Sequence, residues 1–340
     1  MGYMKILMII TAITFGVIPA QAGNFFKDYF KNRYPIVFVD YIPVQASQRI
    51  VIVSTRFFKP EDNFSLKRGI HPRFKQFYFV AAIHNDTAYI KHLEHLDEMT
   101  AFLPAERDFL VYVDGHGKTF GQAIERGFEL TDRFNINMLV FDWPSDYLSL
   151  QKTVNSADEV SASFVKAMRT LNTLYESHYY NSSVSVMFHS MGNRILKNIS
   201  STYLLEKMPR NLFDNIIINA AAVKQQNHTH WVEKLNIQKR IFITSNNMDF
   251  NLKGAAIIRL AEQLGIRNKQ YARNAFYVNF SDFATSEHNL FLGRSQLEKT
   301  KPQIFRFYDL AFHGKQVSMT ENAGFQILSP SDKSFLFSVK

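Results

Sequence analysis

The chain has 340 residues, of which 46% are hydrophobic and 20% charged, and its formal net charge is +9. These proportions are ordinary for a globular protein and exclude a chain that is disordered throughout. The basic residues are dispersed and no nucleic-acid-binding motif is present, so no nucleic-acid partner is expected. A basic surface still allows contact with an anionic membrane surface or an anionic substrate.

Residues 1–22 have the features of a secretory signal. Lys5 supplies a basic start, Ile6–Ile18 form an apolar stretch, and Ala20-Gln21-Ala22 fits the small-x-small cleavage pattern. We therefore expect export, periplasmic or secreted and bacterial, with a mature chain from about Gly23; an uncleaved membrane anchor is the alternative. The chain has no cysteine, so an exported protein would depend on its core and not on disulfides.

Short apolar segments alternate with helical ones along most of the chain. This alternation predicts an α/β fold with a mostly parallel, doubly wound sheet covered by helices on both faces. The first three strands have no helices between them, so we expect antiparallel N-terminal strands at one edge. The expected strands are Ile36–Asp40, Ile50–Ser54, Phe77–Ala82, Phe109–Val113, Met138–Trp143, Val184–Phe188, Ile216–Ala220, Ile241–Thr244 and Phe276–Phe280.

Helical spacing is clear in two places. The apolar residues from Val160 to Tyr175 recur once per turn, and those from Ile257 to Leu264 do so before Gly265, an expected helix terminator. We expect a single domain over residues 23–315, onto which Phe305–Tyr308 can pack. A C-terminal extension, residues 316–340, begins with a polar loop at Gln316–Asn322.

The motif Phe188-His189-Ser190-Met191-Gly192 follows the apolar run Val184–Met187. Ile195, Leu196, Ile199 and Tyr203 then recur at helical spacing. A buried strand that breaks at a serine and continues into a helix lifts the hydroxyl above the sheet edge as a nucleophile. An ordinary serine in a strand-to-helix turn is the alternative.

A serine nucleophile needs a base, and the base needs an acid that orients it. Asp249 follows the expected strand Ile241–Thr244, and His288 follows Phe276–Phe280. We therefore expect Ser190 to attack, His288 to take and later return its proton, and Asp249 to hold the imidazole.

Other residues compete for these roles. Asp282 and Glu287 are alternative acids, and Asp249 can instead cap a helix that starts near Asn251. His116 and His189 are alternative bases, but the sharp turn is expected to point the His189 ring elsewhere.

An oxyanion that forms on attack needs two backbone donors. We assign them to the N–H groups of Met191, directly after the serine, and of His116. His116 lies in Asp114-Gly115-His116-Gly117, which follows the strand Phe109–Val113, and its glycines let the backbone approach a ligand. A simple turn is the alternative.

Two histidine groups could suggest a metal. His92 and His95, near Glu94 and Asp97, have the spacing of ligands on a helix, and His228-Thr229-His230 is a second group. A solvated surface is the favoured interpretation of the first group, and the second is an equally weak signal. We expect neither a metal nor a cofactor.

These residues resemble an uncharacterised branch of the α/β-hydrolase superfamily, from about residue 49 to residue 313. That branch has a Thr-Asn-Arg strand end, Val-His-Gly-Tyr-Asn, Trp-Pro-Ser, Gly-His-Ser-Met-Gly, a Ser-Arg-Asn-Asp loop and a late Asp/His-rich loop. The resemblance implies an α/β-hydrolase fold and a catalytic triad. The counterparts here are Ser54-Thr55-Arg56, Val113–Gly117, Trp143-Pro144-Ser145, Phe188–Gly192, Ser245–Asp249 and Glu287-His288.

Two residues depart from the branch's pattern. Phe188 stands in place of a glycine, so its ring has to turn outward or displace the helix. Asp114 stands in place of a histidine, and its carboxylate has to point away from the oxyanion or be paired.

The sequence therefore predicts an exported serine hydrolase that cleaves a carboxylic ester, with small-molecule or lipid ester substrates. Acyl transfer by the same triad and a catalytically silent relative that binds a ligand or partner are the alternatives. The sequence leaves the oligomeric state open.

Overall fold

The structure is a computed structural model. It describes residues 32–59, 65–70, 75–145, 150–177, 179–258, 260–281, 286–293, 302–317, 325–331 and 334–339. The predicted signal peptide and Asp282 lie outside the described residues. None of the described helices is long and apolar enough to cross a membrane.

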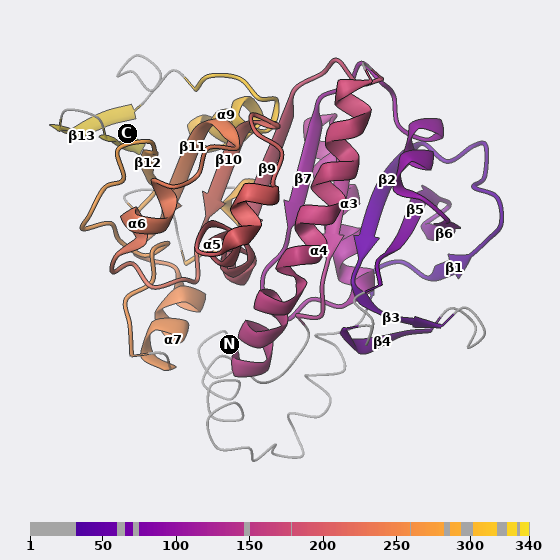
Figure 1. The fold of residues 1–340 in the computed structure, drawn as a ribbon, viewed down its shortest axis with the longest axis horizontal. Coiled ribbons are helices and arrows are strands. Elements are labelled where there is room, and N and C mark those ends of the chain that lie inside the picture. Colours follow the sequence, from indigo (N-terminus) through magenta and orange to yellow (C-terminus); the bar gives the residue numbers. More distant parts are fainter. Residues whose placement is uncertain are drawn as a thin grey trace.

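A sheet of twelve strands runs through the molecule (Figure 1). Its order is β1-β6-β5-β2-β8-β7-β9-β10-β11-β12-β14-β13, and all neighbours from β2 through β8 to β14 pair parallel. The predicted mostly parallel sheet is confirmed. The strands are β1 Ile36–Phe38, β2 Gln48–Ser54, β5 Phe77–His84, β6 Thr87–Leu93, β7 Phe109–Val113, β8 Asn137–Asp142, β9 Val184–His189, β10 Phe213–Asn219, β11 Gln238–Ser245, β12 Phe276–Asn279, β13 Phe325–Ser331 and β14 Ser334–Val339.

The N-terminal edge differs in part from the expectation. Strands β2 and β5 pair antiparallel as expected, but β1 pairs parallel with β6, a strand missing from the prediction. Strand β6 forms a hairpin with β5 through Asn85 and Asp86, whose φ values are +48° and +55°. Such a two-residue turn with positive φ suits a tight hairpin. Two further strands, β3 (Arg56–Lys59) and β4 (Ser65–Ile70), form a separate pair.

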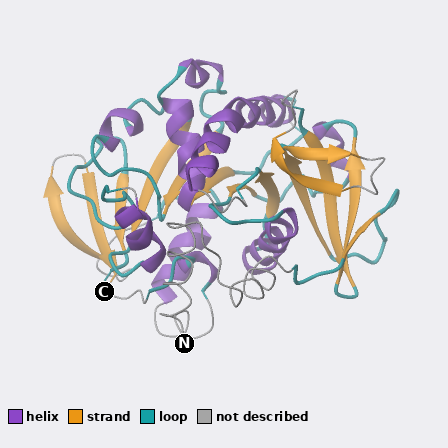
Figure 2. Cartoon of the chain, turned by 90° about the horizontal axis from the view of Figure 1, so that it is seen from below, coloured by secondary structure: helices purple, strands orange, loops and turns teal. Residues whose placement is uncertain are grey.

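Helices cover both faces of the sheet (Figures 1 and 2). One face packs on α4, α5 and α6, and the other on α3 and α9. Side chains alternate along each strand, so Val111 of β7 faces the first core and Leu110 the second. The helices are α3 Phe120–Phe134, α4 Leu150–Glu176, α5 Asn193–Ser200, α6 His228–Val232, α7 Phe250–Ile258 and α9 Pro302–Phe312.

Two predicted helix ends are wrong. Helix α7 stops at Ile258, and Leu260, expected on its apolar face, is 93% exposed with φ +47°. Gly265 lies beyond that end, where a Cβ atom would be 2.5 Å from the carbonyl carbon of Ala220. Helix α5 stops at Ser200, so Tyr203 begins a separate 3-10 turn and is 65% exposed.

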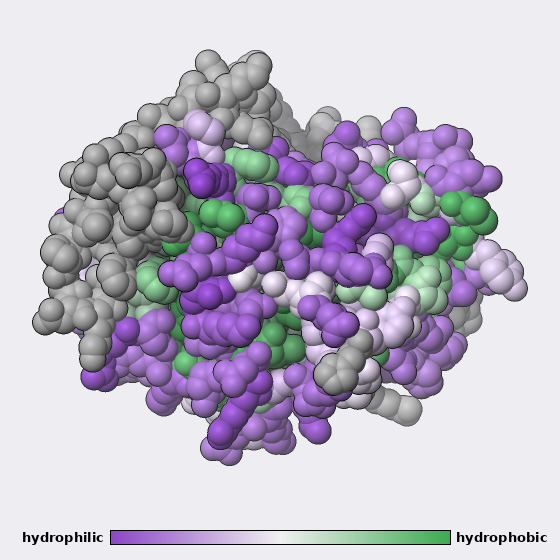
Figure 3. Space-filling view, turned by 90° about the horizontal axis from the view of Figure 1, so that it is seen from above, coloured by the Kyte–Doolittle hydropathy of each residue, from purple (hydrophilic) through white to green (hydrophobic). Residues whose placement is uncertain are grey.

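The C-terminal part belongs to the same structure. In α9, Phe307 and Tyr308 are fully buried, and the Phe307 ring lies 5.6 Å from the rings of Phe242 and Phe280. Strand β14 extends the sheet by pairing with β12. On the face seen from above in Figure 3, hydrophilic side chains predominate and hydrophobic ones form small, separate groups.

Candidate active site

The chain turns sharply at Ser190. Strand β9 ends at His189, the short 3-10 helix η3 (Ser190–Gly192) follows, and α5 begins at Asn193. Ser190 has φ +51°, in a left-handed region that costs free energy for a residue with a side chain. The Asn193 amide braces the turn by donating to the carbonyl oxygens of Phe188 (2.8 Å) and Ser190 (3.1 Å). The expected break from strand to helix is therefore present.

Two glycines allow the neighbouring loop to pass close to this turn. A Cβ atom on Gly115 would lie 2.6 Å from Cβ and 3.1 Å from Oγ of Ser190. A Cβ atom on Gly192 would lie 2.7 Å from the carbonyl oxygens of Val113 and Asp114. The Ser190 hydroxyl thus borders the loop in which the second oxyanion donor is expected.

Phe188 does not disturb the turn. Its ring is fully buried in the core beneath α4, 5.2 Å from the ring of Phe164. The expectation that the ring turns outward or displaces the helix is wrong. Alternation along β9 directs position 188 into the core, and the crowded place at the turn belongs to Gly192.

Asp249 and His288 are hydrogen-bonded at the carboxyl ends of β11 and β12. His288 Nδ1 lies 2.6 Å from Asp249 Oδ2, and the carboxylate is 1% exposed. The other oxygen, Oδ1, accepts the N–H of Leu252 at 3.1 Å and so caps the start of α7. Asp249 is therefore both the imidazole's partner and the helix cap, which the sequence offered as alternatives.

Ser190 and His288 lie at the same end of the sheet but are not hydrogen-bonded to each other within the described part of the chain. The His189 ring contacts His288, with 4.6 Å between the two ring centroids. The bond from serine to base is often long in a free enzyme and shortens when substrate binds. Proton transfer from Ser190 Oγ to His288 Nε2 would require these two atoms to come closer.

The His189 ring, which was expected to point away from Ser190, is directed toward Asn219 and His288. In the parallel register His189 faces Asn219 of β10, whose side-chain amide donates to His189 Nδ1 at 2.9 Å. Burial lowers the pKa of His189 well below its ordinary value, and the nearby positive charge of His288 lowers it further. His189 is therefore neutral near pH 7 and does not compete with His288 for a proton.

Asn219 is itself held by two hydroxyl groups. Its Oδ1 accepts hydrogen bonds from Tyr308 Oη (2.6 Å) and Thr244 Oγ1 (2.8 Å). Tyr308 belongs to α9, so the C-terminal helix fixes the side chain that orients His189. Beside Asp249 and His288 the structure leaves a hollow of only about 10 Å³.

The loop that carries His116 is fixed on both sides of that residue. Trp143 Nε1 donates to the carbonyl oxygen of Asp114 at 3.0 Å, and Gly117 N donates to that of Ser145 at 2.7 Å. The His116 ring turns toward α4, where Nδ1 lies 2.9 Å from Thr153 Oγ1. Trp143 and Ser145 belong to the Trp-Pro-Ser segment, so this motif positions the loop beside Ser190.

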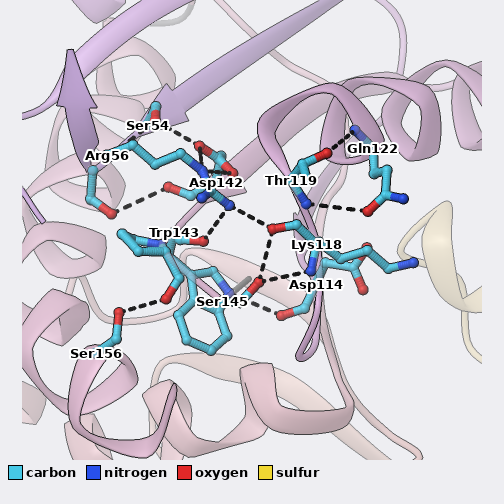
Figure 4. Close-up of polar contacts among 12 residues, drawn as sticks. Ser54, Arg56, Asp114, Lys118, Thr119, Gln122, Asp142, Trp143, Ser145 and Ser156 are labelled. Carbon is cyan, nitrogen blue, oxygen red and sulfur yellow. Dashed lines mark hydrogen bonds and ion pairs between the residues drawn. The ribbon is translucent and has the colours of Figure 1, made fainter. Parts of the chain in front are cut away.

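Arg56 joins the same loop to a buried carboxylate (Figure 4). Its Nε lies 2.9 Å from Asp142 Oδ2, and the two side chains are 3% and 1% exposed. Arg56 Nη2 donates to the carbonyl oxygens of Lys118 (2.7 Å) and Trp143 (2.9 Å). One guanidinium therefore links the end of β8 to the loop before α3.

The Asp114 carboxylate is paired, which is one of the two arrangements expected for a carboxylate beside the oxyanion site. Its Oδ1 accepts the N–H of Gly115 at 2.7 Å, and its Oδ2 lies 3.9 Å from Nε of buried Arg126. The guanidinium balances the carboxylate next to the expected oxyanion site. Burial, and secondly the charge of Asp114, raise the pKa of Tyr112 well above its ordinary value, so Tyr112 stays protonated.

The other candidates lie in different surroundings. No hydrogen bond joins the Glu287 side chain to His288 where the structure describes the chain. His92 lies on strand β6 and His95 directly precedes a 3-10 turn, so the helix expected for this pair is absent there. His228 is buried between the carbonyl oxygen of Gln225 (2.8 Å) and Tyr277 Oη (2.7 Å).

Sequence reasoning missed several residues that position the site. These are the polar residues Asn193, Asn219 and Tyr308, none of which belongs to a local sequence pattern. Asn219 contacts Tyr308 although the two are far apart in the sequence, so the sequence does not reveal their contact. Arg56, which was also given no role, does have a sequence signal, because it belongs to Ser54-Thr55-Arg56, a motif of the family resemblance.

The family described as alpha/beta hydrolase of unknown function (DUF900) matches residues 93–297, more than half of the chain. The chain belongs to this family. The fold and the family agree with the predicted α/β-hydrolase architecture. No curated protein matches the chain.

Solved structures show weaker likenesses. One is ESTFA in its iron-lacking apo form, with a TM-score of 0.44 and 9% identity over 91% of this chain and 96% of that one. Another is S-formylglutathione hydrolase (FrmB) from Staphylococcus aureus, with a TM-score of 0.32 and 9% identity over 78% of this chain and 99% of that one. Both TM-scores are too low to bear on the activity of this chain.

The lowered pKa of His189 predicts a loss of stability in acid. In the unfolded chain His189 binds a proton below the ordinary histidine pKa of about 6.5, whereas folded His189 does not. The free energy of unfolding therefore falls as pH drops below that value. The slope from this group is at most about 1.4 kcal/mol per pH unit. Denaturant unfolding at several pH values gives the dependence of the free energy of unfolding on pH. This dependence should be weaker in His189→Asn than in wild type and unchanged in exposed His95→Asn. Equal slopes in all three proteins would contradict the assignment.

The Arg56 contacts predict a looser loop in Arg56→Lys. Lysine keeps the positive charge but has no planar guanidinium, which here binds Asp142 and two carbonyl oxygens at once. Hydrogen exchange should become faster in peptides covering residues 114–119. Arg240→Lys is the matched control, because Arg240 binds Asn215 and the Gly314 carbonyl at the opposite end of the strands. If both variants leave the exchange of residues 114–119 unchanged, Arg56 does not hold the loop.

Proposed function

We propose that the chain is an exported serine hydrolase that cleaves a carboxylic ester. The observation that carries the proposal is the 2.6 Å contact between Asp249 and His288, next to a strand-to-helix turn with Ser190 at φ +51°. Strained turns of this kind present the nucleophile in α/β hydrolases. Export follows from the signal-like residues 1–22 of the sequence.

Ser190 Oγ attacks the ester carbonyl carbon while its proton passes to His288 Nε2. Asp249 holds the proton on Nδ1 and stabilises the imidazolium that forms. The N–H groups of Met191 and His116 donate to the oxyanion. The alcohol then leaves with the proton from His288, and Ser190 carries the acyl group.

Water completes the reaction. The oxygen of a water molecule attacks the acyl carbon while His288 takes a proton from that water. The proton passes to Ser190 Oγ when the carboxylic acid leaves. Burial keeps His189 neutral, because it lowers the pKa of that imidazole well below its ordinary value. Small-molecule and lipid esters fit this chemistry, and the basic net charge favours contact with an anionic membrane surface.

A catalytically silent relative that binds a ligand or partner is the second candidate. The observation in its favour is that Ser190 and His288 are not hydrogen-bonded to each other within the described part of the chain. Its distinguishing consequence is a folded protein without turnover on any ester.

Incubation with a fluorophosphonate probe tests the two candidates. The wild-type protein should be labelled, Ser190→Ala should not, and exposed Ser177→Ala should be labelled as fast as wild type. Asp249→Asn should react about 10²–10⁴-fold more slowly, with little loss of stability, because asparagine still caps a helix. Unlabelled wild type favours the silent relative, and equal labelling of Ser190→Ala overturns the proposed nucleophile.

A further inference from the structure

A basic hollow lies on the surface between α5 and α6, separate from Ser190, Asp249 and His288. Its volume is about 380 Å³, within the range of small-molecule sites. Cationic and polar side chains line it, among them Lys197, Lys224, Lys234, His230 and Trp231. None of its lining residues is a carboxylate.

Two lysines of this hollow, Lys224 and Lys234, differ from two other surface lysines in their partners. Lys239 and Lys269 each lie 2.7 Å from a carboxylate oxygen, of Asp214 and of Glu262. Lys224 and Lys234 have no carboxylate partner anywhere in the described ranges of the chain. These two lysines therefore bring positive charge to the hollow with no ion pair to balance it in the described ranges of the chain.

The acidic neighbour of Lys234 in the sequence is paired with another residue. Glu233, next to Lys234 in sequence, accepts the backbone N–H of Arg273 at 3.0 Å, and its Oε2 lies 3.2 Å from Arg273 Nη2. The Arg273 side chain is highly exposed, so this ion pair lies at the surface. Because it is paired with Arg273, the Glu233 carboxylate does not neutralise Lys234.

A buried donor is the second observation. Trp231 lines the hollow and is 4% exposed, yet its indole N–H has no hydrogen-bond partner in the described residues. A buried donor without an acceptor is unfavourable. Trp231 therefore adds a nearly buried wall with an unsatisfied donor to this hollow.

We propose that this hollow binds a phosphate-bearing ligand with at least two negative charges. Lysine ammonium groups bind phosphate oxygens as point charges, and several of them around one hollow match a multiply charged anion better than a single carboxylate. The ligand is either free in solution or the headgroup of an anionic lipid. This site does not depend on the proposed hydrolase activity.

Titration calorimetry of the full chain with inorganic pyrophosphate tests the proposal. Wild type should bind, and the affinity should fall as salt is added, because the lysines are exposed. Lys224→Gln/Lys234→Gln should bind at least tenfold more weakly. The matched control, Lys166→Gln/Lys315→Gln, removes the same charge from exposed positions outside the hollow and should bind within twofold of wild type.

Vesicles distinguish the two sources of phosphate. Sedimentation with phosphatidic acid vesicles, whose phosphomonoester headgroup can carry two negative charges, would assign the site to a lipid headgroup if pyrophosphate displaces them. Binding of pyrophosphate without binding of these vesicles would assign it to a soluble ligand. Absence of binding to both, or equal binding by the two double variants, would overturn the proposal.

Discussion

The turn at Ser190 can form only where the chain beside it has no side chains. Gly115 passes against the Ser190 side chain, and Gly192 passes against the carbonyl oxygens of Val113 and Asp114. A methyl group at either position would force the loop and the turn apart. The left-handed backbone of Ser190 costs free energy, which the surrounding contacts must offset. The placement of the hydroxyl beside the loop therefore depends on this close approach.

The polar groups around the turn form two supporting sets. On one side, Arg56, Trp143 and Ser145 hold the loop that contains His116. On the other side, Asn219 holds His189, and Asp249 holds His288 while it caps α7. Each set joins segments that are far apart in the sequence, so the site is assembled by the sheet and its flanking helices.

The sequence was informative where a local pattern has one physical meaning. The apolar strands, the break at Ser190 and the order of Asp249 and His288 all follow from spacing and strand ends. It misled at Phe188, which packs into the core because side chains alternate along β9. It also gave no signal that the register of β9 and β10 places Asn219 beside His189. It gave no signal for Tyr308, because the contact with Asn219 joins positions 89 residues apart.

A crystal structure of the protein after reaction with a fluorophosphonate would test the central claim most directly. The account predicts phosphorus bonded to Ser190 Oγ, with the phosphonyl oxygen within hydrogen-bond distance of the backbone nitrogens of Met191 and His116. His288 should then lie beside the bonded oxygen and keep its contact with Asp249. A phosphonyl oxygen that points to solvent, or an adduct on another residue, would contradict the account.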